Sequence, residues 1–577
     1  MACQGGSRPH CHASQEVWYC VADISASKPR RARRKIQIKE GLRVTCDSGF
    51  MSTADCVPEI AIDSSSAHAQ SKEGKVASTG TYGQILKSSA LVGGSSLLSI
   101  GTGIIRTKLM AVLLGPAGFG LFGLYGSILT LTQTLAGMGI NSSGVRQIAE
   151  AMGSGDAVRV GLTTVVLRRV SVLLGLIGAA VLVIFSGPVS RVTFNTSQNA
   201  NAIVILSAGV LFSLVSAGQG ALIQGMRRIG DLAKMSAVGG VLATFISVLM
   251  VYLFRERGIV PAVVAVAMMT LLVSWWYSRK IEIHAPVLAA ADIIREASAL
   301  LKLGFAFMVS GLLTMGVAYG VRVTVLHRFG VEATGLYQSA WTLGGLYVGF
   351  ILQAMGADFY PRLTATAKDD ELCNRLVNEQ VQVGLLIAGP GVIAILTVAP
   401  IFLSFLYSSR FAGAVGILRW ICLGALLQVV TWPMGFIIVA KARQALFIAC
   451  ELAWSLVSLG LAWLCMKYFG LDGAGIAFFV SYIFHGVLIY AVARQLTGFC
   501  WSRQSRHIGF VFLLIFSVVI GGHFVLPWLW ASGIGVVAAM GSGIYAVRVL
   551  LHLVPLDSLP RPVRKALGLL RLAPSGS

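Results

Sequence analysis

Charged residues are scarce in this chain of 577 residues: 12% are Asp, Glu, Lys or Arg, whereas 56% are apolar. A soluble globular domain carries about 25% charged residues, so this composition excludes one. The apolar residues form continuous runs and do not alternate with polar ones, as the strands of a membrane barrel would require. Runs of roughly 20 residues can cross a bilayer as α-helices. The sequence therefore predicts an all-α polytopic membrane protein.

Motifs for catalysis and for nucleotide hydrolysis are also missing. No Gly-x-x-x-x-Gly-Lys-Ser/Thr loop is present to hold the phosphates of ATP. The cysteines lack the two-residue spacing of a zinc site. Membrane glycosyltransferases and polysaccharide polymerases usually need a large outer loop or paired acids at a membrane edge, whereas the outer loops of this chain are short. The sequence therefore predicts a protein that is not an enzyme and has no metal site and no cofactor.

Residues 1–87 contain no apolar run and carry a basic cluster between Lys28 and Lys35. The cluster is not followed by the apolar core of a signal peptide. We expect this polar segment to be disordered. A start of translation at Met51 or later is a hypothesis that N-terminal mass mapping can test.

About fourteen apolar runs follow residue 87, and each is interpreted as one transmembrane helix. The boundaries carry an uncertainty of several residues. The spans are expected near 88–112, 119–140, 164–186, 202–223, 233–254, 259–277, 303–326, 336–358, 382–406, 416–439, 444–467, 473–493, 508–528 and 531–552.

These spans predict two lobes of six helices and a final pair. Residues 88–280 form the N-lobe and residues 303–495 the C-lobe, joined by a cytoplasmic connecting segment at 281–302. Residues 507–552 contain the last two spans, and residues 553–577 form a basic cytoplasmic tail.

Basic residues are concentrated in the loops that follow even-numbered spans, as in Arg227 and Arg228 or Lys441 and Arg443. Because cytoplasmic loops carry an excess of Lys and Arg, both termini are expected to face the cytoplasm. The net charge of +22 follows largely from this bias. Basic loops beside anionic lipid explain it, so no nucleic-acid partner is expected.

A pattern recurs about 215 residues apart: an arginine in an apolar helix, then Gly-x-x-x-x-Gly-Leu-aromatic, then a second apolar helix. Six spans return the chain to its starting side, so the two halves are parallel repeats. Their pseudo-twofold axis would run along the membrane normal, with a substrate site between the lobes. Two like halves in one membrane predict a transporter, and the glycines are expected to form structural turns. The residues are Arg106, Gly115, Gly120, Leu121 and Phe122, then Arg322, Gly330, Gly335, Leu336 and Tyr337.

Several segments between residues 85 and 495 resemble the bacterial polysaccharide transporters, notably flippases of lipid-linked O-antigen and enterobacterial common antigen units. They belong to a superfamily shared with multidrug exporters and peptidoglycan precursor flippases. The segments are Arg106-Thr-Lys108-Leu-Met-Ala-Val-Leu-Leu-Gly-Pro-Ala-Gly118-Phe-Gly120-Leu, Leu135-Ala-Gly-Met-Gly-Ile140, Leu300-Leu-Lys302-Leu-Gly-Phe, and Ile438-Val-Ala-Lys441-Ala-Arg443 leading to Glu451.

The resemblance implies two lobes that open alternately to each side of a bacterial inner membrane. The implied substrate is an oligosaccharide on undecaprenyl pyrophosphate, moved to the outer leaflet for O-antigen or exopolysaccharide synthesis. Membrane lipids, and a polymerase or chain-length machinery, are the implied partners. Two alternatives remain open: a multidrug or metabolite exporter of the same superfamily, and a membrane-embedded polysaccharide polymerase.

Ionisable residues at membrane depth are the candidate site, because a charge in lipid costs at least about 2.5 to 3.5 kcal/mol. Arg106, Lys108 and Arg322 lie in the outer halves of their spans, and Arg419 lies near the outer end of span ten. They are predicted to form a cationic cavity that binds pyrophosphate or an acidic sugar. The alternative is that they extend to the outer membrane interface.

Three further residues are candidates for ion coupling. Glu451 in span eleven and Lys234 in the matching stretch of span five could form an ion pair, or Glu451 could carry a coupling proton. His485 in span twelve could titrate, although a lone histidine on an apolar helix is more often a packing residue. Coupling to H⁺ or to Na⁺ is left open.

Overall fold

The computed structural model describes residues 64–153, 156–281 and 290–553. The chain divides into two compact units, residues 1–75 and residues 76–577. Of the first unit, only the beginning of helix α1 falls within the described residues, so the fold discussed below is that of the second. Of the predicted tails at 1–87 and 553–577, residues 1–63 and 554–577 lie outside the described part.

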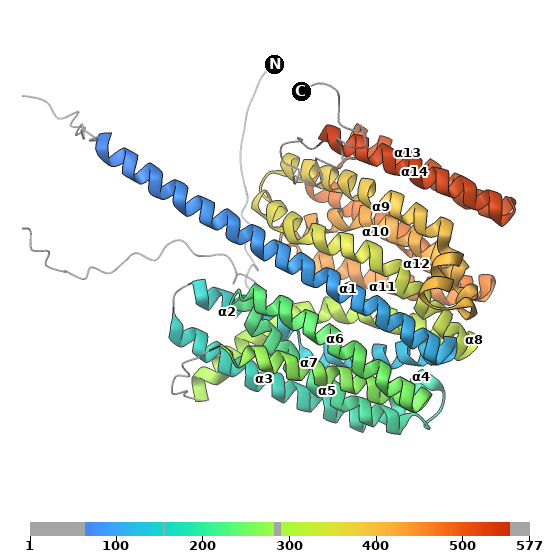
Figure 1. Ribbon diagram of the computed structural model, residues 1–577, viewed down its shortest axis with the longest axis horizontal. Coiled ribbons are helices and arrows are strands. Elements are labelled where there is room, and N and C mark those ends of the chain that lie inside the picture. The colour runs from blue at the N-terminus through green and yellow to red at the C-terminus, as the bar shows by residue number, and fades with distance from the viewer. Residues whose placement is uncertain (1–63, 154–155, 282–289, 554–577) are drawn as a thin grey trace, which may run out of the picture. The chain divides into compact units, whose positions relative to one another are not determined.

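Helices make up almost all of the described chain, and no strand occurs in that part (Figure 1). The first half contains α1 (Ser64–Gly137), α2 (Ile140–Gly153), α3 (Ala157–Ile184), α4 (Ser186–Phe194), α5 (Ala200–Gly225), α6 (Ile229–Phe254), η1 (Arg255–Gly258) and α7 (Ile259–Ser278). The second half contains α8 (Ala290–Ala365), α9 (Asp370–Leu406), η2 (Ser409–Ala414), α10 (Val415–Ala440), α11 (Gln444–Phe469), η3 (Gly470–Asp472) and α12 (Gly473–Thr497). The last two helices are α13 (Arg503–Val525) and α14 (Trp528–Leu553).

The expected all-α fold is confirmed. Ten stretches of the described chain are long and apolar enough to span a membrane, and four of them, 40 to 54 residues long, each contain two helical segments. This matches the predicted count of fourteen. The structure departs from the expectation at the first span, because α1 begins at Ser64, inside the segment expected to be polar and disordered.

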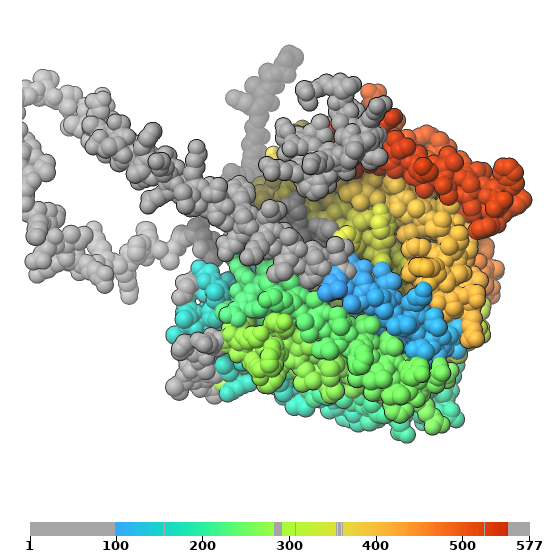
Figure 2. Space-filling model, in the orientation of Figure 1, coloured from blue at the N-terminus to red at the C-terminus, as the bar shows by residue number. Residues whose placement is uncertain are grey.

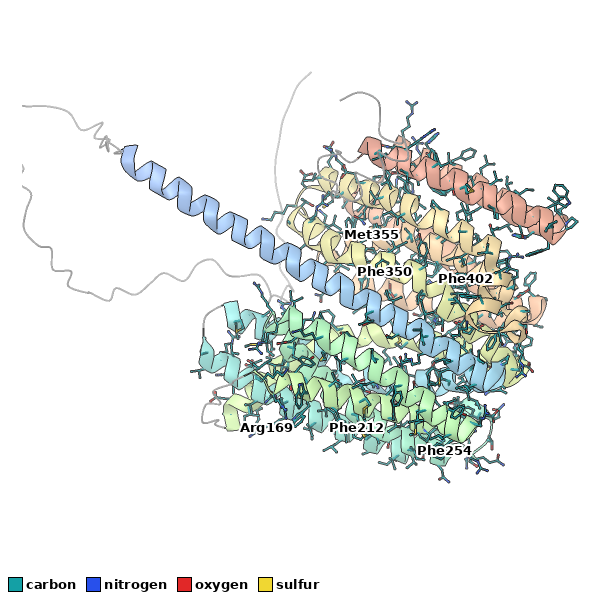
Figure 3. All side chains as sticks on the ribbon, in the orientation of Figure 1. Arg169, Phe212, Phe254, Phe350, Met355 and Phe402 are labelled. Atoms are coloured by element: carbon teal, nitrogen blue, oxygen red, sulfur yellow. The ribbon has the colours of Figure 1, made fainter. Side chains whose placement is uncertain are left out.

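The outer surface of both halves is apolar, as a lipid-facing surface requires. Side chains project outward around the helices (Figure 3). Among the labelled residues, Phe254 of the first half has an exposed fraction of 56% and Phe350 of the second half one of 46%. In water such a surface would be an aggregation site, whereas in a bilayer it needs no cover.

Two long helices, α1 and α8, each contain one sharp kink. Gly115 in α1 has φ of 64° and Gly330 in α8 has φ of 86°, while the residues on either side are helical. Positive φ at these positions favours glycine, because a side chain would be strained there. Each long helix therefore consists of two spans joined by a one-residue turn. We call the end of the bundle that carries both kinks the kink end.

The two repeats match residue for residue in the bounds of two helix pairs. Helices α5 and α10 begin and end 215 positions apart, and so do α6 and α11. The turns that follow repeat as well, including residues with positive φ that are not glycine, which are uncommon. The positive-φ pairs, each 215 positions apart, are Gly115 and Gly330, Arg227 and Ala442, and Arg255 and Gly470.

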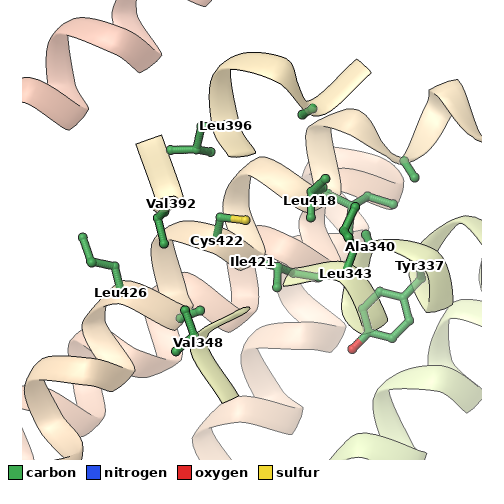
Figure 4. Close-up of a cluster of buried hydrophobic side chains, with 14 of the residues drawn as sticks. Tyr337, Ala340, Leu343, Val348, Val392, Leu396, Leu418, Ile421, Cys422 and Leu426 are labelled. Atoms are coloured by element: carbon green, nitrogen blue, oxygen red, sulfur yellow. The ribbon is translucent and has the colours of Figure 1, made fainter. Parts of the chain in front are cut away.

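The core of the second half lies between α8, α9 and α10. Side chains from these helices interlock with little or no exposure, among them Tyr337 and Ala340 from α8, Val392 from α9, and Ile421 and Cys422 from α10 (Figure 4). The packing makes the second half a firm wall for the cavities described below.

The last pair of helices is fixed to α9 by buried hydrogen bonds. Asn378 of α9 accepts from the backbone N–H of Ser502 at 2.8 Å and from the hydroxyl of Ser505 at 2.8 Å. Its amide donates to the carbonyl of Cys500 at 3.1 Å, and Gln382 donates to the Ser505 hydroxyl at 2.9 Å. The start of α13 is thus attached to the second half.

Helix α8 also contacts the first half. Its opening turns, within the predicted connecting segment, are helical and continuous with the first membrane arm of α8. Glu296 accepts a hydrogen bond of 2.7 Å from Thr163 of α3, and the fully buried Leu300 packs in an apolar cluster with Ile148 and Leu167. One rigid helix therefore joins the two halves.

Candidate functional site

A cavity of about 480 Å³ lies between the second arm of α1 and the second half of the chain. Both arms of α8 line it, together with α10, α11 and α12. From α1 it receives small and hydroxyl residues such as Gly126, Ser127 and Thr130. Its size lies in the range of about 300 to 1,000 Å³ that ligand sites occupy.

Arg322 is the one Lys or Arg among the described residues that line this cavity. It is 7% exposed. Its Nε donates to Oε1 of Gln338 at 2.7 Å and its Nη1 donates to the carbonyl of Ala318 at 2.8 Å. The guanidinium carbon lies 5.7 Å from the ring centre of Trp341. Since no carboxylate pairs with it in the described chain, the charge is held in place yet left uncompensated.

Gln338 is positioned by a glycine of the first half. A Cβ added to Gly123 would lie 2.6 Å from Oε1 of Gln338, closer than real Cβ atoms come. Gln338 also donates to the hydroxyl of Thr342 at 3.1 Å, which fixes the orientation of its amide. Because Gly123 has no side chain, Gln338 has the space to accept the hydrogen bond from Arg322.

A second cavity, of about 250 Å³, adjoins the first and lies farther from the kink end. Thr314, Gln428, Trp454 and Tyr482 line both. Glu451 of α11 lines only the second and has no ion-pair partner in the described chain. His485 of α12 lines it too. A carboxylate without an ion-pair partner and an imidazole therefore both line this cavity.

The kink end is closed by contacts between the halves. A Cβ on Gly120 would lie 2.7 Å from the backbone nitrogen of Gly335, and one on Gly335 would clash with the carbonyl of Pro116. The ring of Phe119 packs edge-on against Tyr407 and Phe411, with centroids 5.5 and 5.9 Å apart. The backbones touch because glycines occupy the contact.

Hydrogen bonds from α4 to α8 add to this closure. The hydroxyls of Thr193 and Tyr319 lie 2.6 Å apart, and Nε2 of His327 lies 3.0 Å from the carbonyl of Thr193. The opposite end is also in contact: a Cβ on Gly304 of α8 would clash with the carbonyl of Met138, beside Gly139. The halves therefore meet at both ends, with the cavities between.

The predicted cationic residues do not converge on one cavity. Arg106 is partly buried and hydrogen-bonds to no other described residue, yet it is not among the residues that line either cavity. At an offset of 215 its counterpart is Val321, not Arg322. The expected equivalence of the two arginines is thus off by one residue, or about 100° around a helix.

Lys108 and Arg419 also point elsewhere. The ammonium of Lys108 lies 4.5 Å from the ring centre of Phe405. Nη2 of Arg419 lies 3.2 Å from Nδ1 of His523 on α13, away from the cavity. Within the described chain, both side chains therefore make contacts outside the cavity.

Lys234 and Glu451 do not form the expected ion pair. Lys234 is exposed on α6, a helix that packs on α5 and α7, whereas α11 packs on α8, α10 and α12. Glu451 and His485, by contrast, do share one cavity. Of the four glycines predicted to form turns, Gly115 and Gly330 lie at the kinks, whereas Gly120 and Gly335 are helical and form close backbone contacts.

The sequence reasoning missed the aromatic and amide residues of the cavity walls. Glu451, Trp454, Ser458 and Ala462 of α11 all line the cavities and recur every three or four residues. Polar and aromatic residues at that spacing on an apolar helix mark one face. Applied to α8, α11 and α12, this signal would have found the cavity.

Comparisons with known proteins agree with this architecture. The family described as "Polysaccharide biosynthesis protein" matches residues 109–416, just over half of the chain. The lipid III flippase of Escherichia coli K12 is 24% identical over 439 residues, which cover 73% of this chain and all of that protein.

Two solved structures share the fold. The lipid II flippase MurJ in an inward closed conformation superposes with a TM-score of 0.60 at 14% identity, over 80% of this chain and 100% of MurJ. An inward-facing multidrug resistance transporter of the MATE family gives a TM-score of 0.56 at 15% identity, over 69% of this chain and 95% of that one. The chain therefore belongs to the polysaccharide biosynthesis protein family, and its resemblance to bacterial polysaccharide transporters is confirmed.

Proposed function

We propose that this protein is a flippase that carries undecaprenyl-pyrophosphate-linked oligosaccharide units from the cytoplasmic to the outer leaflet of a bacterial inner membrane. The observation that carries the proposal is Arg322, an uncompensated cation held in the wall of a cavity at membrane depth. A guanidinium suits the oxygens of a phosphate, and two of its nitrogens are already anchored to the protein. The relative in Escherichia coli is itself named as a flippase of a lipid, which supports transport and not catalysis.

The sides of the membrane follow from charge. Arg227, Arg228, Lys441 and Arg443 lie in turns at the end opposite the kinks. The positive-inside rule places that end, and both termini, in the cytoplasm, and places the kink end outside. The closed contact between Gly120 and Gly335 is then an outer gate. The lipid tail stays in the bilayer while the polar head crosses between the halves.

Energy for the step can come from the membrane potential. A potential negative inside contributes roughly 2.3 kcal/mol per charge per 100 mV, which favours outward movement of the anionic head. After release of the substrate, the protein must return to the conformation that opens the empty cationic cavity to the cytoplasm. We assign the coupling of that return to Glu451 and His485, which share the second cavity, with H⁺ or Na⁺ as the coupling ion.

The test is a gene deletion followed by measurement of lipid-linked oligosaccharide on each leaflet. Deletion and Arg322→Ala are expected to trap the lipid-linked unit in the inner leaflet while the protein stays inserted and abundant. The matched control is Arg328→Ala, on the same helix but stacked over Trp463 outside the cavities. Normal outer-leaflet levels in the deletion strain would overturn the proposal.

Glu451 is the one observation that favours a second function, export of cationic compounds. A carboxylate without a partner in a cavity can hold a cation. Two results together would establish the exporter. Cells should export a cationic dye and lose that efflux in the Glu451→Gln variant, and deletion of the gene should leave their lipid-linked oligosaccharides normal. The role in O-antigen or exopolysaccharide synthesis, and any polymerase partner, belong to the flippase proposal and are tested by loss of surface polysaccharide on deletion.

A further inference from the structure

We propose that the two adjoining cavities form a saccharide-binding track in the second half of the protein, lined by a continuous series of aromatic rings. The track would hold the glycan, not the pyrophosphate, of the substrate, so this inference rests on the proposed function. Its occupant is a short oligosaccharide of neutral or N-acetylated sugars.

The rings form an unbroken series from the kink end inward. Tyr337 stacks with Trp341 at a centroid distance of 6.1 Å, and Trp341 meets Phe478 edge-on at 5.3 Å. Phe478 meets Tyr482 at 4.9 Å, and Tyr482 meets Trp454 at 5.6 Å. All five rings line the first cavity, and Trp454 and Tyr482 continue into the second. Aromatic rings in mutual contact therefore line both cavities.

His485 extends the series within the second cavity. Its ring lies 5.9 Å from Trp454 and 5.8 Å from Tyr482, edge-on to both. Contacts between aromatic rings of this kind fix the orientation of each ring before a ligand arrives. Such a pre-arranged wall lowers the cost of binding.

Unpartnered polar atoms lie along the same walls. Trp454 is 8% exposed, and its Nε1, a donor only, has no acceptor among the described residues. Nδ1 of His485 is buried without a partner as well, and it donates or accepts according to its tautomer. A buried donor with no acceptor costs free energy, so the indole N–H favours a ligand that brings oxygen acceptors. Hydroxyl and acetamide oxygens of a sugar are such acceptors.

The remaining polar lining is neutral. Gln428 and Thr314 border both cavities, and Ser127, Thr130 and Ser458 border the first. A pyranose ring presents apolar C–H faces to aromatic rings and hydroxyls around its edge, which matches walls of rings and neutral hydrogen bonders. An acidic glycan would instead need further cations along the track, and Arg322 is the one Lys or Arg among the described residues lining the two cavities.

The two charges stand at different places along the track, which gives it a direction. Arg322 lines only the first cavity and Glu451 only the second. The phosphate-linked end of the glycan then lies beside Arg322 and its far end beside Glu451. Because like charges repel, a uronic acid at the far end is disfavoured. The track therefore selects for neutral sugars at that end.

The test uses the purified full-length protein in nanodiscs and saturation-transfer NMR with soluble probes. The probes are N,N′-diacetylchitobiose, maltotriose, digalacturonic acid and inorganic pyrophosphate. We expect one or both neutral probes to bind, and the digalacturonate to bind at least about tenfold more weakly. Trp341→Leu and Trp454→Leu should each weaken neutral-probe binding about tenfold or more.

A paired substitution separates the ring from its N–H. Trp454→Phe keeps a ring but removes the donor, so binding should weaken about threefold to tenfold, less than in Trp454→Leu. Trp463→Leu is the matched control, because Trp463 is 54% exposed and is not among the residues lining either cavity. Thermal unfolding of each variant establishes that it is folded.

The outcomes distinguish this inference from the proposed function. If the protein moves the lipid-linked unit but binds neither neutral probe, or binds one unchanged in folded Trp341→Leu and Trp454→Leu variants, the track is wrong and the flippase stands. If the neutral probes bind as expected but deletion leaves the leaflets normal, the track stands and the flippase fails. Binding of pyrophosphate that Trp341→Leu and Trp454→Leu abolish, with no saccharide binding, also overturns the track.

Discussion

Gly120 and Gly335 hold the same position in the two repeats and pack directly against each other. A Cβ on Gly120 would lie 2.7 Å from the nitrogen of Gly335. The same relation joins Gly123 and Gln338, which are also 215 positions apart and in contact. A residue touches its own counterpart only where the symmetry axis passes between them. The axis of the duplication therefore runs through the contact at the kink end.

Gly335→Ala is expected to disrupt that contact. The added methyl group would clash with the carbonyl of Pro116, a backbone atom that cannot rotate away. Overpacking of this kind costs about 1 to 3 kcal/mol, here in the closed state. Spin labels placed on the two halves at the kink end should report a larger separation. Gly316→Ala, in the same helix with nothing within 4 Å, should leave the separation unchanged.

Tyr319→Phe should loosen the same end without any clash. It removes the hydrogen bond of 2.6 Å to Thr193, which joins α8 to α4. A net loss of about 0.5 to 1.5 kcal/mol would raise the open population about twofold to twelvefold. The accessibility of a cysteine introduced into the first cavity, to a reagent added from the kink side, measures the change. Tyr252→Phe, at an exposed position, is the control, and equal labelling in both variants would contradict the role of the bond.

Arg322→Lys should lower translocation although the charge remains. Lysine cannot make the bonds to Gln338 and Ala318 and still present a second nitrogen to the cavity. We expect the rate in reconstituted vesicles to fall about tenfold, corresponding to one lost charge-assisted hydrogen bond. A rate equal to that of the native protein would show that charge alone suffices.

Glu451→Gln should uncouple transport from the ion gradient. The amide keeps the shape of the side chain but cannot take up a proton or hold Na⁺ by charge. Transport driven by an imposed H⁺ or Na⁺ gradient should be lost, while the dependence on membrane potential is retained. Glu256→Gln, at an exposed position in η1, serves as the control. Retained response to both gradients in Glu451→Gln would exclude the coupling role.

Asn378→Ala should detach α13 and α14 from the second half. The substitution leaves the N–H of Ser502 and the carbonyl of Cys500 without their partner. Each buried group left unsatisfied costs about 1 to 3 kcal/mol. We expect a lower unfolding temperature and proteolysis before α13 at lower protease concentrations. Asn201→Ala, exposed on α5, should change neither.

The fold was predictable because a bilayer enforces one pattern on the sequence. Continuous apolar runs located the spans, basic loops predicted their orientation, and the recurring Gly-x-x-x-x-Gly-Leu-aromatic pattern indicated the repeat. The site was less predictable, since a charge at membrane depth says nothing of its direction around the helix. Arg106 corresponds to Val321 and not to Arg322, and of the two arginines Arg322 lines the first cavity whereas Arg106 lines neither cavity. The predicted ion pair between Lys234 and Glu451 was wrong, because one sequence does not show which helices are neighbours.

The continuity of α8 sets a mechanical limit on any opening. Its first turns are bonded to α3 through Glu296 and Thr163, while its membrane arm belongs to the second half. From its start to the kink at Gly330, α8 is one continuous helix that is attached to the first half at its opening turns. Rotation of one half must therefore either break the hydrogen bond between Glu296 and Thr163 or bend α8 between Glu296 and the first cavity. The stiffness of this one element thus bounds how far the halves can swing.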